Sequence, residues 1–353
     1  MLELYRRVGS ATLIMENKNN IRDILPDASD KLIHALQNAE EARKRAEVEL
    51  EYDIRYGIEP LCMNDERYPK RLKECDDAPL LLFYKGNANL NQQRIINIVG
   101  TRRCTPYGED LIRHFIADLK QLSPHVLIVS GLAYGVDINA HRQALANGYE
   151  TVGVLAHGLD DLYPSRHRET AIRMISQGGL LTEFLTQTNA DKINFVRRNR
   201  IVAGISDACI LIESAAHGGG LITTEISQSY GRDVFTFPGR IGDAYSEGCN
   251  KLIRNNGATL ITSADDFVKD MGWQDDAKLM RAKQQGIERN LFLDLTEEEQ
   301  AVVNVLTKHN DLQINMIGTQ ANIAVGKLAA ILFTLEMKGV VKTLAGGMYH
   351  LLK

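Results

Sequence analysis

The segment 191–204, DKINFVRRNRIVAG, places several cations and one aromatic residue next to a short apolar run. The cations are Lys192, Arg197, Arg198 and Arg200, and the aromatic residue is Phe195. Arginine suits phosphate because its planar guanidinium group makes two parallel charge-assisted hydrogen bonds, and an aromatic ring offers a base a stacking surface. We expect a helix that begins in the arginines and is anchored in a core by Ile201 to Gly204, with its N-terminal end favouring anions. A solvated or ion-paired helix start is the alternative.

Histidines and carboxylates in the middle of the chain could instead serve acid–base chemistry. They include His141, His157, His167 and His217, together with Asp137, Asp160, Glu183 and Glu213. In a Rossmann-like nucleotide-binding or nucleoside-phosphate-hydrolysing enzyme, Glu213 or Asp137 would act as general acid or base beside a bound ribose phosphate. No activated pair stands at short spacing. We therefore expect no catalytic residues and no enzyme, and this enzyme class is the alternative function.

Composition narrows the class of protein further. The five cysteines are scattered and lack the spacing of a zinc site, so we expect reduced thiols, cytoplasmic localisation, and neither a metal nor a cofactor. The N-terminus has no apolar signal core and no run of about eighteen apolar residues occurs, so no membrane partner is expected. With a formal net charge of -4, a nucleic-acid site has to be a local patch on a mildly acidic protein.

From Arg94 onward the sequence repeats an apolar strand, a glycine-rich turn and an amphipathic helix, which is typical of an α/β fold with a parallel sheet. The expected strands are Ile95 to Val99, Val126 to Val129, Thr151 to Leu155, Leu180 to Thr182, Ala208 to Ile212, Val234 to Phe237 and Thr259 to Ile261, and Leu80 to Tyr84 is expected to lead into them. Helices are expected at Gly108 to Gln121 and Tyr134 to Ala146.

Glycine-rich loops follow three of these strands, at 100–103, 130–137 and 213–220. Ligands of parallel sheets bind at the carboxyl ends of the strands, where such loops leave backbone N–H groups bare at helix starts. None of the loops has the GxGxxG or GxxxxGK[ST] spacing. Three loops on one sheet edge, joined by the arginine-rich segment, predict a polyanion site.

Smaller modules are expected at both ends of the chain. Residues 1–57 predict a helical module with helical spacing from Lys31 to Glu51. Plain packing is favoured for it over a SAM-like or helix-hairpin-helix contact with duplex DNA through residues 8–10. Residues 58–272 form the expected main domain and 273–293 a charged linker. Residues 294–353 read as three helices and a hairpin.

Several short motifs occur in a familiar order: IVGTR (98–102), SGLAYGVDINAH (130–141), GLDDLYP (158–164), FVRRNRIVAG (195–204) and GGGLITT (218–224). Together they closely resemble the DNA-processing protein A family, also called Smf. The resemblance implies an extended Rossmann-like parallel sheet with a C-terminal winged-helix-like domain. It also implies sequence-independent binding of single-stranded DNA by a homodimer, and loading of a RecA-type recombinase in natural transformation and recombination, with single-strand-binding protein as a further partner.

The resemblance also implies a set of DNA-binding residues. Arg102 is similar to the family's phosphate-binding arginine, Lys192 to its DNA-contacting lysine and Phe195 to its base-stacking residue. The residues expected to complete the site are Arg197, Arg198 and Arg200, with Gly131, Gly218 and Gly219 as backbone donors. Where this chain has Gly218 and Gly219, the family more often has Ser-Gly, a change that removes a hydroxyl and keeps the N–H donors.

The C-terminal domain is a poor candidate for groove reading. Its third helix, expected at Val325 to Lys338, would enter a DNA groove by the winged-helix rule. That helix offers only Lys327 and Lys338, and the lysines and carboxylates from Asp294 onward nearly balance. Because a nearly neutral domain neutralises few phosphates, we expect a protein contact or a regulatory role.

Overall fold

The computed structural model describes residues 1–274 and 295–352, apart from 311, 339, 345 and 346. The chain divides into two compact units, Met1–Ala277 and Lys278–Lys353. From residue 275 onward, the expected charged linker lies outside the described residues.

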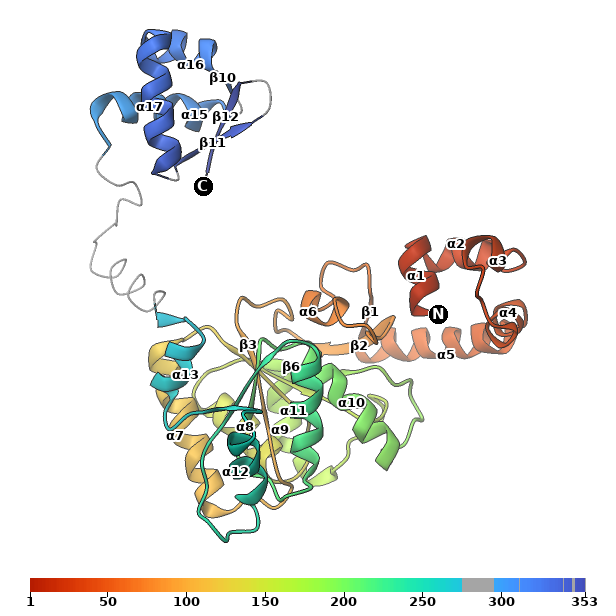
Figure 1. The fold of residues 1–353 in the computed structure, drawn as a ribbon. Coiled ribbons are helices and arrows are strands. Elements are labelled where there is room, and N and C mark those ends of the chain that lie inside the picture. The colour runs from red at the N-terminus through yellow and green to blue at the C-terminus, as the bar shows by residue number, and fades with distance from the viewer. Residues whose placement is uncertain (275–294, 311, 339, 345–346, 353) are drawn as a thin grey trace. The chain divides into compact units, whose positions relative to one another are not determined.

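A nine-stranded sheet forms the centre of the first unit (Figure 1). Its strand order is β1-β2-β6-β5-β4-β3-β7-β8-β9. The strands are β1 (Glu59–Cys62), β2 (Leu81–Gly86), β3 (Ile95–Val99), β4 (Leu127–Ser130), β5 (Thr151–Val154), β6 (Gly178–Thr182), β7 (Ala208–Leu211), β8 (Asp233–Thr236) and β9 (Thr259–Leu260). The pairs from β6 to β9 are parallel, which confirms the expected α/β fold, whereas β1 and β2 are antiparallel additions. Strands β4 to β6 extend the sheet on one side of β3, and strands β7 to β9 extend it on the other side. The strand order therefore reverses at β3, which makes this strand the topological switch point.

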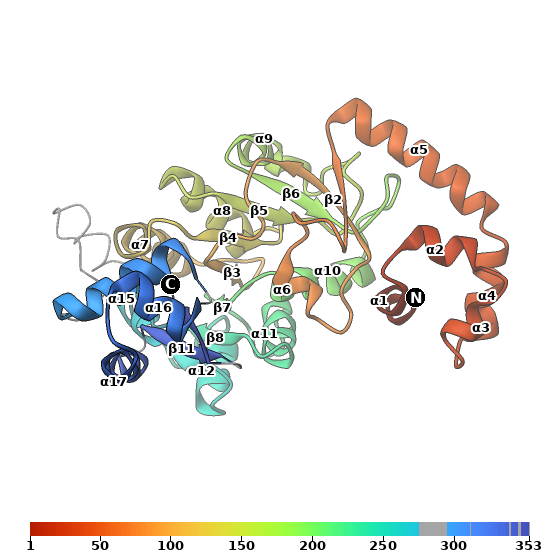
Figure 2. The same cartoon turned by 90° about the horizontal axis from the view of Figure 1, so that it is seen from above.

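Helices cover both faces of this sheet (Figure 2). One face carries α7 (Pro106–Leu122), α8 (Val136–Ala146), the turn η1 (Ser165–His167), α9 (Arg168–Ser176) and α13 (Ala264–Asp270); the other carries α6 (Lys70–Lys73), α10 (Lys192–Gly204), α11 (Gly219–Ser229) and α12 (Glu247–Arg254). Alternate β3 side chains point to opposite faces. Ile96 therefore joins the core that contains Phe115 of α7, and Ile95 joins the core that contains Ile201 of α10.

The N-terminal module consists of α1 (Leu2–Val8), α2 (Ala11–Glu16), α3 (Ile21–Ile24), α4 (Asp30–Gln37) and α5 (Glu40–Tyr56). The helical spacing from Lys31 to Glu51 does not produce one helix, because the chain breaks at Asn38 and Ala39. Asn38 ends α4: its backbone N–H and its Nδ2 both donate to the His34 carbonyl oxygen, each at 3.0 Å. An asparagine that binds the preceding turn in this way competes with helix continuation.

The N-terminal module packs directly onto the sheet. Its buried side chains Leu4, Ile14, Ile21 and Leu36 belong to the same core as Leu61 of β1 and Leu82 of β2. Arg6 adds a polar contact, since its Nη2 donates to the Cys75 carbonyl oxygen at 2.7 Å. The module and the sheet therefore share one hydrophobic core.

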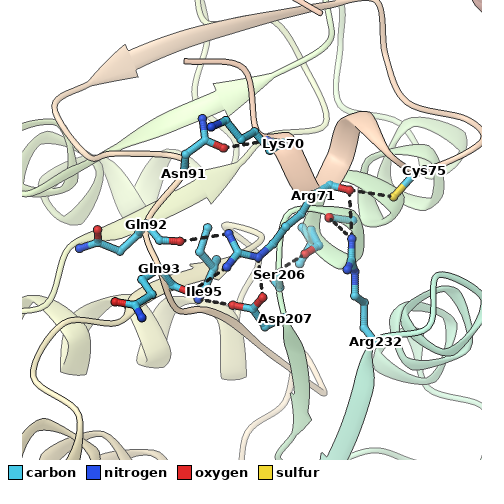
Figure 3. A network of polar contacts seen from close by, with 12 residues as sticks. Lys70, Arg71, Cys75, Asn91, Gln92, Gln93, Ile95, Ser206, Asp207 and Arg232 are labelled. Carbon is cyan, nitrogen blue, oxygen red and sulfur yellow. Dashed lines mark hydrogen bonds and ion pairs between the residues drawn. The ribbon is translucent and has the colours of Figure 1, made fainter. Parts of the chain in front are cut away.

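Arg71 holds α6 against the sheet (Figure 3). Its Nε lies 2.5 Å from Asp207 Oδ1, and its terminal nitrogens donate to the carbonyl oxygens of Gln92 and Gln93 at 3.0 and 2.8 Å. The other oxygen of Asp207 accepts from the Ile95 N–H at 2.8 Å. Because Asp207 precedes β7 and Ile95 begins β3, this network fixes the amino ends of the two strands at the switch point.

The second unit has the expected winged-helix order. Its elements are α15 (Glu297–Lys308), β10 (Leu312–Gln313), α16 (Ile314–Ala321), α17 (Val325–Met337), β11 (Val341–Leu344) and β12 (Met348–Leu351), with sheet order β10-β12-β11. Leu328 and Leu332 of α17 are buried in the core of this unit. Among the described residues, no single helix has the length and apolar composition of a membrane span, and α16 and α17 meet that test only as a pair bent by 105°.

Candidate nucleic-acid interface

A cavity of about 600 Å³ lies at the carboxyl ends of β3, β4 and β7. The end of β3 and the loop after it contribute 99–102. The loop after β4 contributes Gly131 and Ala133, and the start of α8 contributes Asp137. The loop after β7 contributes Ala215 and Gly218, and the start of α11 contributes Gly219. The first two turns of α10 form a further wall with Lys192, Phe195 and Arg198. The three glycine-rich loops and the arginine-rich segment thus meet at the switch point of the sheet, where open α/β folds bind ligands.

Close backbone approach explains two of the glycines in the loop after β4. A Cβ atom at Gly131 would lie 2.3 Å from Asp137 Oδ2 and 2.5 Å from both terminal nitrogens of Arg198. Gly135 has a φ of 74°, and a Cβ there would lie 2.2 Å from the Thr101 carbonyl oxygen. A side chain at Gly131 would displace the Asp137 and Arg198 side chains, and one at Gly135 would push the loops after β3 and β4 apart.

Gly218 and Gly219 bring a helix start to the cavity. Gly218 is the N-cap residue of α11 and Gly219 is its first residue, and no side chain caps this helix. The first N–H groups of a helix have no partner within the helix, and the helix dipole favours negative charge there. The start of α11 can therefore donate backbone hydrogen bonds to an anion in the cavity.

The start of α10 is set by Asp191, not by the arginines. The Asp191 Oδ1 accepts from the Asn194 N–H at 2.7 Å, so the helix begins at Lys192. Lys192 is exposed at this first turn, and Phe195 follows one turn later. The guanidinium carbon of Arg102 lies 4.7 Å from the centre of the Phe195 ring. A guanidinium group and an aromatic ring are therefore in contact, although they come from different elements.

Arg198 lines the cavity and is buried close to Asp137 and His141. It is 4% exposed and donates to the carbonyl oxygen of Val154. Burial raises the pKa of Asp137 and lowers that of Arg198, and the opposite charge of each partner counters the shift. Burial also lowers the pKa of His141 to about 4, so this histidine is neutral, and its Nε2 donates to the Gly131 carbonyl oxygen at 2.6 Å. These three buried side chains support the Gly131 loop.

Arg197 and Arg200 lie outside the lining of the cavity, on the side of α10 that faces Glu183. Arg200 is paired with Glu183 and donates to the Asp77 carbonyl oxygen. Arg197 is 56% exposed, lies 3.8 Å from Glu183 and has its guanidinium carbon 5.5 Å from the Phe184 ring centre. Because successive helix residues point in different directions, only Arg198 of the three arginines lines the cavity. None of the three lies in the first turn of α10.

The carboxylates considered for catalysis make structural contacts. Glu213 is 3% exposed, and its two oxygens accept from the N–H and the hydroxyl of Thr105, at 2.8 and 2.6 Å, where α7 begins. The Asp137 Oδ2 accepts from the Ala133 N–H at 3.2 Å. In the part of the chain that the structure describes, no group of three or more His, Cys, Asp or Glu side chains is placed to hold a metal ion. These contacts hold loops in place.

The family model for DNA recombination-mediator protein A matches residues 59–272, and the model for the DprA winged helix domain matches residues 293–347. The chain belongs to this family. The resemblance that the motifs indicate is thereby confirmed, as is the winged-helix identity of the C-terminal domain.

Two relatives in this family align with more than half of the sequence. The DNA processing protein DprA of Streptococcus pneumoniae is 40% identical over 204 residues, which span 58% of this chain and 71% of the relative. Protein Smf of Escherichia coli is 31% identical over 297 residues, 82% of this chain and 76% of the relative. The X-ray structure of the S. pneumoniae protein superimposes with a TM-score of 0.64 at 32% identity, over 76% of this chain and 93% of that one.

A second solved structure in the family is DNA processing protein A from Helicobacter pylori, which is described for its single-stranded DNA binding mode. It matches with a TM-score of 0.55 at 28% identity, over 61% of this chain and 95% of that one.

The sequence analysis did not predict several cationic and aromatic side chains that lie close to the cavity. Arg103, Arg142 and Arg166 line a smaller hollow together with Arg102 and Tyr134. Arg103 and Tyr134 stand inside two of the glycine-rich loops, so the loops themselves carried a signal. Arg142 and Arg166 are far apart in the sequence, and only the fold brings α8 and η1 together at this hollow.

Proposed function

We propose that the cavity at the carboxyl ends of β3, β4 and β7 binds single-stranded DNA without sequence preference. The contact between Arg102 and Phe195, with Lys192 on the same wall, carries this proposal. Arg102 and Lys192 bind phosphates, the N–H groups of the glycine loops add donors, and a base stacks on Phe195. Contacts to the DNA phosphates do not depend on the base, and any base can stack on an aromatic ring. This set of groups therefore binds a strand regardless of its sequence.

Two further observations support a single strand as the ligand. Tyr163 is 48% exposed and its ring centre lies 5.9 Å from that of Phe195, so the aromatic surface extends beyond one ring. The H. pylori protein, whose fold this chain shares, is described for binding single-stranded DNA. Within the site, Arg198 acts as a positioning residue beneath Gly131, and Arg197 and Arg200 hold α10 against Glu183.

We also propose that the chain works as a homodimer in the cytoplasm and delivers the bound strand to a RecA-type recombinase in natural transformation and recombination. Its membership in a family of recombination mediators supports this role. Single-strand-binding protein is a further proposed partner, because it covers the same strands. Titrating the recombinase onto strands coated with single-strand-binding protein tests the role. Loading should accelerate with the wild-type chain and not with Arg102→Ala.

The binding proposal is tested by Arg102→Ala and Lys192→Ala. Each should weaken binding of single-stranded oligonucleotides by a similar factor whatever their sequence, because each removes a phosphate contact. The slope of log affinity against log salt should fall by roughly 0.7 for each variant. The matched control is Arg173→Ala on α9, an exposed arginine outside the cavity, which should leave the slope unchanged. Unchanged slopes in both cavity variants would contradict the site.

A further inference from the structure

A second hollow, of about 330 Å³, lies next to the proposed DNA cavity. Four arginines line it: Arg102 and Arg103 from the loop after β3, Arg142 from α8 and Arg166 from the η1 turn. All four are exposed. The hollow is distinct from the first cavity, and Arg102 is the arginine that lines both. A ligand bound at Arg102 can therefore extend from one hollow into the other.

The charge of this hollow is available to an anion. Among the described residues, Arg103, Arg142 and Arg166 have no carboxylate within ion-pair distance, whereas Arg67, Arg71 and Arg200 of the same unit are each paired. Glu109 is the one carboxylate in the described lining, and its Oε1 accepts from Asn139 Nδ2 at 3.2 Å. Guanidinium groups gathered without acid partners repel one another, and a phosphate relieves that repulsion.

Tyr134 adds an aromatic surface to the same hollow. Its side chain is 42% exposed, and its ring packs edge to face on His167, with ring centres 5.0 Å apart. His167 is itself buried and fixed, because its Nδ1 lies 2.9 Å from the Leu132 carbonyl oxygen, which can only accept. A tyrosine ring held in one orientation offers a base a stacking surface at little cost in conformational entropy.

We propose that this hollow is a second nucleotide subsite for single-stranded DNA. The strand leaves the Phe195 cavity across Arg102, places its next phosphates on the guanidinium groups of Arg103, Arg142 and Arg166, and stacks a base on Tyr134. The inference rests on the proposed function, because it extends the same strand. It predicts that binding depends on oligonucleotide length in two steps, one for each subsite.

The test compares wild type, Tyr134→Ala and the double variant Arg142→Ala/Arg166→Ala on oligo(dT) of two lengths, about four and about twelve nucleotides. Tyr134→Ala should weaken binding of the longer oligonucleotide by roughly 5- to 100-fold and leave that of the shorter one unchanged. The double variant should lower the salt slope of the longer oligonucleotide by roughly 1.4, again without effect on the shorter one. Arg173→Ala serves as the control for the loss of an exposed arginine outside both hollows.

The outcomes separate the two proposals. If wild type binds neither oligonucleotide, the proposed function fails. If wild type binds both with equal affinity, or if the variants weaken both lengths by the same factor, the second subsite fails while the first stands. All three substituted residues are exposed, so folding should survive, and circular dichroism of each variant checks this. Length-dependent loss in both variants supports the subsite.

Discussion

Three arginines within four residues of one helix have three different surroundings. Arg198 is buried beside Asp137, Arg200 is paired with Glu183, and Arg197 is mostly exposed near the same carboxylate. A buried guanidinium group needs partners in the protein, so Arg198 cannot give its full donor capacity to a ligand. Among single residues of α10, the DNA contacts that we propose are therefore limited to Lys192 and Phe195.

Phe195→Ala tests the stacking role. If a base stacks on this ring, the substitution should cost on the order of 1–3 kcal/mol of binding free energy and leave the salt slope nearly unchanged, because no phosphate contact is lost. Fluorescence anisotropy with labelled oligo(dT) at several salt concentrations measures both quantities. Phe195→Tyr should retain most of the affinity. Equal binding by the alanine variant and wild type would leave Phe195 as a packing residue that orients Arg102.

At the scale of elements, helix α5 fixes the loop that leads into α10. The Thr186 N–H and hydroxyl donate to the two oxygens of Glu49, at 2.8 and 2.7 Å, and Arg45 Nη2 donates to the Thr186 carbonyl oxygen at 2.7 Å. On the other side, Asp160 Oδ2 accepts from the Gln187 N–H at 2.8 Å. The N-terminal module thus helps to position the segment that carries Lys192.

One turn along α5 from Glu49, Asp53 is buried without a hydrogen-bond partner. It is 2% exposed, and neither of its carboxylate oxygens has a partner among the described residues. Burial raises the pKa of Asp53 to about 6, and the negative charge of Glu49 adds to the effect. The folded protein therefore takes up a proton at Asp53 more readily than the unfolded chain does. This carboxyl destabilises the fold once it is ionised.

Asp53→Asn tests this linkage. The folded-state pKa lies above the unfolded value of 3.8, so the wild-type free energy of unfolding should fall as pH rises between those values, by on the order of 2–3 kcal/mol for this group. The difference between variant and wild type should consequently increase from pH 4 to pH 7. Urea unfolding at several pH values measures it. Glu51→Gln, at an exposed position on the same helix, is the control, and a pH-independent difference for Asp53→Asn would contradict the prediction.

Across the whole chain, the two units differ in whether their cationic side chains are paired with carboxylates. In the smaller hollow beside β3, Arg103, Arg142 and Arg166 have no acid partner among the described residues, whereas the lysines in and directly after α17 are paired within their own domain. Lys338 Nζ lies 2.7 and 2.8 Å from the two oxygens of Glu299, and Lys327 is paired with Glu298. Phe333 and Met337 on the same helix are 65% and 74% exposed. Paired lysines beside exposed apolar side chains favour a protein contact over phosphate binding.

Deleting residues 294–353 should therefore leave single-strand affinity and its salt slope within about twofold of wild type. The pairing of Lys327 and Lys338 predicts that this domain adds few phosphate contacts. Electrophoretic mobility shift with single- and double-stranded oligonucleotides of equal length measures the effect. A marked loss of single-strand binding would mean that the domain contacts the strand.

The alternation of strands and amphipathic helices determined the parallel sheet, because hydrophobic periodicity is a local property of the chain. Glycines after β3, β4 and β7 likewise predicted one ligand edge, since parallel strands place their carboxyl ends together. The sequence did not reveal β1, or the break between α4 and α5. Strand β1 was missed because the pairing of an edge strand depends on residues far away in the sequence. The break was missed because a single asparagine, Asn38, ends an otherwise regular helical pattern.

Only the tertiary structure decided which cations share a surface. The rotation of α10 about its axis is set by the packing of Ile201 against the sheet, and this packing turns Arg198 inward and Arg197 and Arg200 toward Glu183. Arg102 in the loop after β3 contacts Phe195 of α10, and Arg142 of α8 and Arg166 of η1 line the same hollow. Sequence spacing determines the neighbours within a helix or strand. Contacts between elements follow from how their apolar faces pack, so the sequence alone did not show which of these cations lie together.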